Sequence, residues 1–130
     1  MAYFADLSPY DYPPFRMQSR SGLLNVGWLD AGVPYSKGAV DSGTLDRLIR
    51  LSEKPTNRTR GWHRCPFCTA YPARLKHGGR ELVLGDAEIH IPGRDETVFA
   101  CPTLICHYIL DHGYRPPDKF LAAVSDLPQE

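Results

Sequence analysis

The chain has 130 residues, 15 basic and 15 acidic side chains, and 42% hydrophobic residues. This composition excludes a disordered chain and a general electrostatic attraction to nucleic acid or anionic membranes, and the length suits one domain over residues 1–130. No apolar run reaches the roughly 20 residues that cross a bilayer and no secretory signal opens the sequence, so we expect a cytoplasmic protein with reduced or metal-bound cysteines and no membrane partner.

The first half of the chain predicts an extended arm, one strand and one helix. Residues 1–20 are rich in proline and aromatic side chains, which favours an extended arm packed on the domain rather than a helix. Within residues 21–60, an apolar run predicts a strand over 23–29. Apolar side chains at helical spacing then predict a helix over 41–52, with Asp41 or Ser42 as its N-cap.

In the second half, residues 61–113 predict a cysteine-containing turn followed by a hairpin and a helix. Strands are expected over 81–85, 87–91 and 97–100, with a turn at residues 85–86 between the first two. The middle strand alternates apolar residues with Glu88 and His90, which predicts both polar side chains on a solvated face.

Two helices are expected near the C-terminus. Pro102 suits the first turn of a helix that ends before Gly113, and apolar spacing predicts a second helix over 118–124 within residues 114–130. The predicted fold class is therefore α+β, built around a small antiparallel sheet.

One motif carries clear chemistry, the Cys65-Pro66-Phe67-Cys68 segment, called the knuckle below. Two thiolates at this spacing can turn about a tetrahedral zinc ion, and His107 and His112 have the spacing of a zinc-finger histidine pair. We therefore predict a structural Zn²⁺ held by these four side chains. Knuckle, hairpin and helix would form an enlarged zinc-finger or treble-clef-like ββα unit.

Other ligand sets stay open. His63 lies two residues before the knuckle, and Cys101 and Cys106 flank the start of the predicted helix. Cys106 is more typical of an apolar core residue, because free cysteine is among the most buried residue types.

Two catalytic interpretations compete with structural zinc. The Cys-Pro-Phe-Cys sequence resembles a glutaredoxin active site, but that chemistry needs a preceding buried strand and a helix that starts at the first cysteine, and Pro72 disfavours such a helix. A metal-dependent nuclease could use His90 as general base and His107 or His112 as ligands. A structural zinc site leaves no coordination position for water, so we predict no catalytic residue.

Basic residues surround the knuckle among the aromatic side chains of Trp62, Phe67 and Tyr71. Interleaved basic and aromatic side chains can bind a nucleic-acid backbone and stack on bases, while nearby acidic residues favour a solvated surface instead. The candidate nucleic-acid contacts are Arg58, Arg60, Arg64, Arg74, Lys76 and Arg80.

The chain also resembles a family of small uncharacterised bacterial proteins that is common in actinomycetes. The resemblance rests on residues 6–10, 25–29, 60–68, 85–89, 102–109 and 112–117. It implies that knuckle, hairpin and helix form one unit. It also favours His107 as a ligand, because the position of Cys106 is commonly not a cysteine in that pattern. The resemblance implies no known function.

Together these observations predict a zinc-stabilised, non-catalytic module that binds another protein, as an adaptor or a toxin-immunity protein does. The alternative is a nucleic-acid-binding zinc protein that uses the arginine-rich region around the knuckle.

Overall fold

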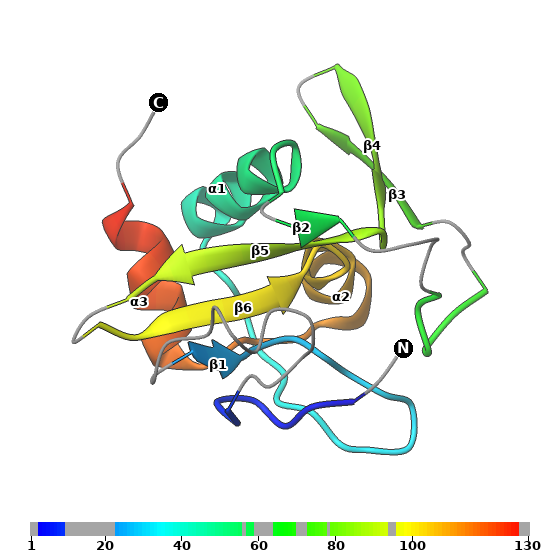
Figure 1. Cartoon of the computed structure of the whole chain (residues 1–130). Coiled ribbons are helices and arrows are strands. Elements are labelled where there is room, and N and C mark those ends of the chain that lie inside the picture. Colours follow the sequence, from blue (N-terminus) through cyan, green and yellow to red (C-terminus); the bar gives the residue numbers. More distant parts are fainter. Residues whose placement is uncertain are drawn as a thin grey trace.

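The structure is a computed structural model that describes residues 3–9, 23–55, 57–58, 64–69, 73–77, 79–93 and 96–127. Within these ranges the chain forms a small α+β fold, as predicted (Figure 1). The elements in chain order are β1 (Leu23–Asn25), α1 (Ser42–Ser52), β2 (Asn57–Arg58), β3 (Ala73–His77), β4 (Arg80–Leu84), β5 (Ala87–Pro92), β6 (Val98–Pro102), α2 (Ile105–His112) and α3 (Asp118–Asp126). None of the described helices has the length and apolar character that crossing a membrane requires.

The main sheet has the strand order β1-β6-β5-β2. Strand β5 is antiparallel to both of its neighbours, as expected, but β1 runs parallel to β6, with Leu24 opposite Phe99. The prediction of a purely antiparallel sheet was therefore wrong at this pair. Two neighbouring parallel strands need a long crossover connection, and here that connection contains α1, β2, β3, β4 and β5.

Strands β3 and β4 form a separate two-stranded hairpin that projects away from the main sheet (Figure 1). The sequence pattern predicts β4 but not β3. It also places a turn at residues 85–86, but this turn does not close a hairpin. Gly85, at φ 116°, instead carries the chain from β4 into the main sheet, where β5 pairs with β6.

The predicted helices are present with shifted ends. Helix α1 begins after Asp41, whose carboxylate accepts the backbone N–H of Thr44, so the predicted N-cap is confirmed. Helix α2 begins three residues later than predicted, because Pro102 lies in β6 opposite Glu88. Gly113 ends α2 in the left-handed conformation, as predicted, and α3 extends to Asp126.

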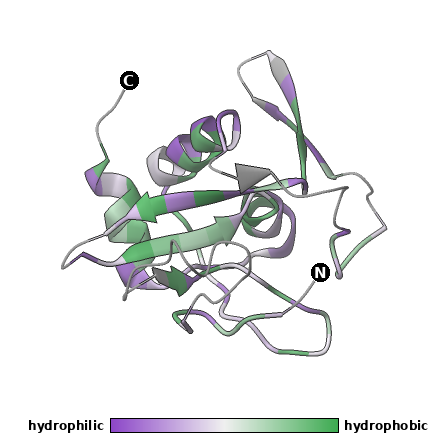
Figure 2. Ribbon diagram, viewed as in Figure 1, coloured by the Kyte–Doolittle hydropathy of each residue, from purple (hydrophilic) through white to green (hydrophobic). Residues whose placement is uncertain are grey.

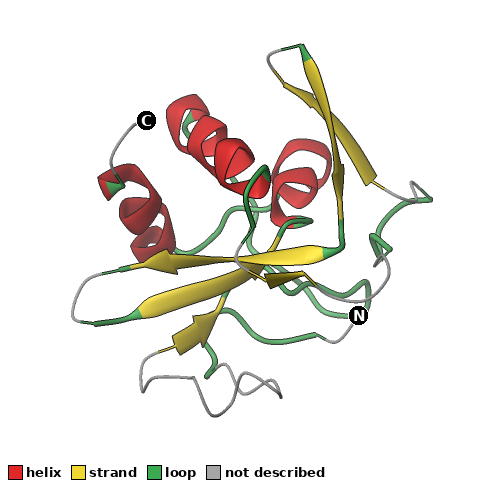
Figure 3. Cartoon of the chain, turned by 45° about the horizontal axis from the view of Figure 1, so that its top comes forward, coloured by secondary structure: helices red, strands yellow, loops and turns green. Residues whose placement is uncertain are grey.

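The core lies between the main sheet and the three described helices, which all cover the same face of that sheet (Figure 3). Ile89 on β5 and Leu48 on α1 are buried there, and Phe99 on β6 packs edge-on against Phe120 on α3, with ring centres 5.7 Å apart. Strand β6 is hydrophobic along most of its length, which fits a strand in the middle of the fold (Figure 2).

Glu88 and His90 differ from their predicted solvated positions. The Glu88 side chain is only 2% exposed and that of His90 is 22% exposed, with 2.8 Å between Glu88 Oε1 and His90 Nε2. The alternation along β5 predicts which residues share a face of the strand but not whether that face is exposed to solvent, so the prediction fails for Glu88.

The N-terminal arm packs on the domain within residues 3–9. Phe4 lies edge-on against Trp28, with ring centres 5.7 Å apart, and the N–H of Leu7 donates to the carbonyl of Asn25 over 2.7 Å. Phe4 and Leu7 therefore attach this part of the chain to residues 25–28. Residues 10–20 of the predicted arm lie outside the described residues.

Candidate metal centre

A cluster of sulfur and nitrogen donors forms where the knuckle meets helix α2. Cys65 and Cys68 lie in a turn between β2 and β3, while His107 and His112 come from α2. One donor atom from each of these four side chains lies within 4.8 Å of the other three. The structure therefore brings together the four side chains that the sequence predicts as ligands.

The spacing of the donor atoms suits a tetrahedral ion. The Nε2 atoms of His107 and His112 are 3.3 Å apart, Cys65 Sγ is 3.3 Å from His112 Nε2, and Cys68 Sγ is 3.4 Å from His107 Nε2. Bonds of about 2.0 Å to nitrogen and about 2.3 Å to sulfur give tetrahedral edges of about 3.3 Å between nitrogens and about 3.5 Å between nitrogen and sulfur. The donors are thus already arranged at distances that one metal ion requires.

Two neighbouring groups orient these donors. The backbone N–H of Phe67 donates to Cys65 Sγ over 3.4 Å, which holds the turn of the knuckle. On α2, Asp111 Oδ2 lies 3.2 Å from His107 Nδ1. A proton on Nδ1 leaves the Nε2 lone pair for a metal. Sequence reasoning missed Asp111, although its position four residues after His107 places both on one helix face.

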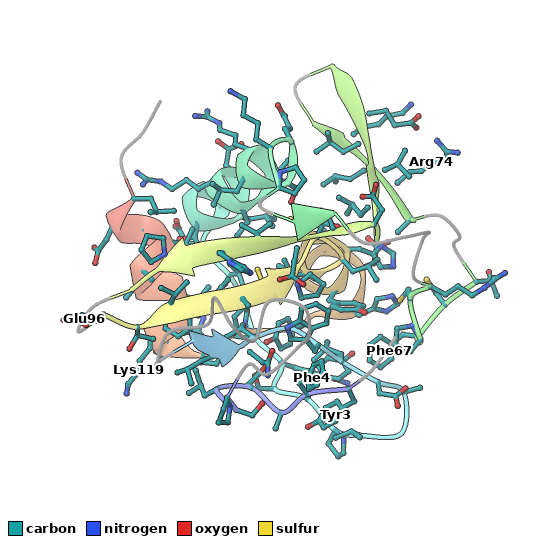
Figure 4. All side chains as sticks on the ribbon, in the orientation of Figure 1. Tyr3, Phe4, Phe67, Arg74, Glu96 and Lys119 are labelled. Carbon is teal, nitrogen blue, oxygen red and sulfur yellow. The ribbon has the colours of Figure 1, made fainter. Side chains whose placement is uncertain are left out.

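Aromatic packing fixes the knuckle against α2. Phe67 is labelled in Figure 4. Its ring lies 5.3 Å from the His112 ring and 5.8 Å from the Tyr108 ring, measured between centres. Tyr35 packs on Phe67 at 5.0 Å, and its hydroxyl donates to the carbonyl of His112 over 2.8 Å. A loop, the knuckle and α2 therefore meet at the cluster.

Burial shifts the pKa values of Cys65 and His107 in the absence of a metal ion. Burial is the main cause that raises the pKa of the Cys65 thiol to about 11, and nearby Cys68 adds to the effect. Burial also lowers the pKa of His107, although the Asp111 carboxylate opposes this, so its imidazole is neutral at pH 7. A neutral imidazole can donate its lone pair to a metal, and a bound cation would stabilise the Cys65 thiolate.

The alternative ligands occupy other places. Cys101 and Cys106 are fully buried in the apolar core and do not belong to the cluster. Cys106 Sγ lies 3.4 Å from Ser52 Oγ, and burial raises its pKa to about 11, which fits its predicted role as a core residue. His63 lies outside the described residues.

The two catalytic interpretations find little support in this geometry. The described residues that follow Cys65 up to residue 69 form turns, not the helix that activates a redox cysteine, and the raised pKa of Cys65 opposes thiolate formation in the absence of a cation. His90 lies on β5 beside Glu88 and is not part of the metal cluster.

The predicted nucleic-acid contacts are only partly described. Arg64, Arg74 and Lys76 are exposed, and Arg74 Nη1 lies 3.4 Å from Glu81 Oε1 across the hairpin. Arg60 and the side chains of Arg58 and Arg80 lie outside the described residues. These contacts stay a prediction.

Comparisons with known proteins give one match. No curated protein and no solved structure matches the chain. One family model, a domain of unknown function designated DUF7919, matches residues 2–125, which is nearly the whole sequence and includes the knuckle and α2. The chain therefore belongs to the DUF7919 family.

Proposed function

We propose that this protein is a non-catalytic binding module that is stabilised by one structural Zn²⁺. Cys65, Cys68, His107 and His112 would hold the ion. The observation that carries the proposal is the spacing of the four donor atoms, which matches the edges of a tetrahedral site with two sulfur and two nitrogen ligands. Thiolate and imidazole donors in this geometry favour zinc over magnesium, calcium or manganese.

The proposed role of the ion is structural. It would join the knuckle to α2 across 38 intervening residues between Cys68 and His107. Four protein ligands fill a tetrahedral site and leave no position for a substrate or an activated water. We propose that the knuckle, the β3–β4 hairpin and α2 act as an enlarged zinc-finger-like unit with a binding role. We propose a cytoplasmic protein as the partner, in an adaptor or toxin-immunity role.

Metal analysis tests the proposal directly. We would express the chain without a metal-affinity tag, measure zinc per chain by mass spectrometry, and compare wild type with Cys65→Ser and His107→Ala. The expected result is one zinc per wild-type chain and loss of zinc in both variants. His90→Gln is the matched control, because His90 lies outside the cluster and this variant should keep its zinc. A wild-type chain that holds no zinc after purification under reducing conditions would refute the proposal.

Nucleic-acid binding is the second candidate, with the exposed Arg64 beside the knuckle and the exposed Lys76 on β3 in its favour. Its support is weaker, because Arg74 is paired with Glu81 and the sequence has no net charge. The effect of salt concentration on binding distinguishes the two proposed functions. Binding to phosphates weakens steeply as counterions are added, whereas an apolar protein interface should persist when the complex is washed at raised salt.

A further inference from the structure

The two cysteines of the knuckle differ in their exposure to solvent. Cys68 is exposed, whereas Cys65 is 4% exposed, and their sulfur atoms lie within 4.8 Å of each other. The other two cysteines, Cys101 and Cys106, are each 0% exposed in the core. A small oxidant in solution therefore meets Cys68 first, and Cys65 supplies a second thiol sulfur within 4.8 Å of it.

We propose that the knuckle is an oxidation site that releases its metal when hydrogen peroxide converts Cys65 and Cys68 into a disulfide. This inference rests on the proposed zinc site, because a metal-bound cysteine is a thiolate and the thiolate is the form that reacts with peroxides. Sequence spacing supports the product as well, since two intervening residues are the spacing of redox-active disulfides.

The reaction balances in two steps. The Cys68 thiolate attacks one oxygen of the peroxide, so that an S–O bond forms, the O–O bond breaks, and the departing hydroxide takes a proton from solvent. The Cys65 thiolate then attacks the Cys68 sulfur, forming the S–S bond and expelling the second oxygen as hydroxide, which is also protonated. Two thiolates lose two electrons and the peroxide becomes two waters. The zinc ion stays divalent and dissociates, because the disulfide sulfurs are uncharged.

Loss of the ion would remove the bond between the knuckle and α2 but not their packing. Phe67 still contacts Tyr108 and His112, and Tyr35 still covers Phe67. The expected product is therefore a folded chain whose knuckle is more weakly attached to α2. Adding a thiol reductant and zinc should restore the starting state, because no further oxidation of sulfur is needed for release.

The test uses the wild-type protein with zinc already bound. We would add hydrogen peroxide, follow zinc release with a chromogenic chelator, block remaining thiols by alkylation, and map disulfides by peptide mass spectrometry. We expect one zinc released per chain, a disulfide that joins Cys65 to Cys68, and alkylated Cys101 and Cys106 after unfolding. The double variant Cys101→Ala, Cys106→Ala is the matched control and should release zinc within twofold of the wild-type rate.

Three results would overturn the inference while leaving the zinc site intact. These are zinc retention in excess peroxide, zinc release with Cys68 converted to a sulfinic or sulfonic acid and no disulfide, and a disulfide that includes Cys101 or Cys106. Absence of zinc before peroxide is added would instead overturn the proposed function and this inference together.

Discussion

Asp111 and His107 lie one helical turn apart in α2, with the carboxylate of Asp111 3.2 Å from Nδ1 of His107. The opposite nitrogen of the same ring, Nε2, is 3.4 Å from the sulfur of Cys68. One imidazole therefore connects a surface carboxylate to the centre of the donor cluster. Such carboxylate–histidine pairs orient the ring and increase its basicity as a metal ligand.

Replacing Asp111 by asparagine should weaken zinc binding without abolishing it. Partners of this kind affect metal affinity by about 10–100-fold. Because the Asp111 side chain is 61% exposed, we expect an effect at the lower end of this range, about a tenfold increase in the zinc Kd. Competition with a chelating dye measures this Kd. Asp118→Asn is the control, because Asp118 pairs with Arg115 away from the cluster. Equal Kd values in the two variants would contradict a positioning role for Asp111.

The two core cysteines should be dispensable for metal binding but not for stability. Cys101 and Cys106 are fully buried, so truncation of either to alanine should lower the free energy of unfolding by about 1–2 kcal/mol. Each variant should keep one zinc per chain. Urea unfolding and metal analysis of the same samples check both statements. Loss of zinc from either variant would place that cysteine in the ligand set instead.

Tyr114 and Tyr108 allow a comparison of how much a buried tyrosine hydroxyl contributes to stability with and without a hydrogen-bond partner. The hydroxyl of Tyr114 donates to the carboxylate of Asp6, with 2.9 and 3.0 Å to its two oxygens. Tyr108 is equally buried, but its hydroxyl has no hydrogen-bond partner among the described residues. Tyr114→Phe should cost about 1.5–3 kcal/mol, whereas Tyr108→Phe should leave stability unchanged or raise it. Chemical denaturation measures the free energy of unfolding of both variants. Equal losses of stability would contradict the stated difference between the two hydroxyls.

Gly27 should be the least replaceable glycine near α2. Its φ of 82° lies in the left-handed region, and a Cβ atom there would approach Ile105 Cδ1 to 3.0 Å. Gly27→Ala should therefore lower stability by more than about 1 kcal/mol, through backbone strain and crowding together. Gly32 is the control, since a Cβ atom there meets nothing within 4 Å, and Gly32→Ala should stay within about 0.5 kcal/mol of wild type. Thermal unfolding curves for the two variants give the comparison, and indistinguishable melting temperatures would refute it.

Local signals in the sequence predicted the helices and the grouping of the four Cys/His side chains. Capping by Asp41, the left-handed stop at Gly113 and the two-residue cysteine spacing each depend on a few adjacent residues. Once the turn and the helix are predicted, the approach of Cys65 to His112 can be predicted as well. Both side chains are typical zinc ligands and could bind the same ion.

The pairing of distant strands could not be predicted in this way. Nothing in the short β1 sequence distinguishes a parallel partner from an antiparallel one, and Leu24 pairs with Phe99 far along the chain. The burial of Glu88 has the same origin, because alternation predicts two faces of a strand but not that both are covered. Asp111 was missed for a different reason, since its role depends on the ring orientation of His107 rather than on a motif.

The parallel pairing of β1 with β6 has a consequence for how the protein is made. As the chain leaves the ribosome, Leu24 has no strand partner until Phe99 has been synthesised, and Cys65 meets His112 later still. The contact of α1 with α3, where the hydroxyls of Thr44 and Ser125 lie 3.1 Å apart, also joins segments far apart in the sequence. These long-range contacts therefore form only after β6, α2 and α3 have been synthesised, whereas the local pairings of β3 with β4 and of β5 with β6 do not have to wait for α2 or α3. A truncated chain that ends before α2 would lack the contacts made by α2 and α3 and would expose its apolar strands.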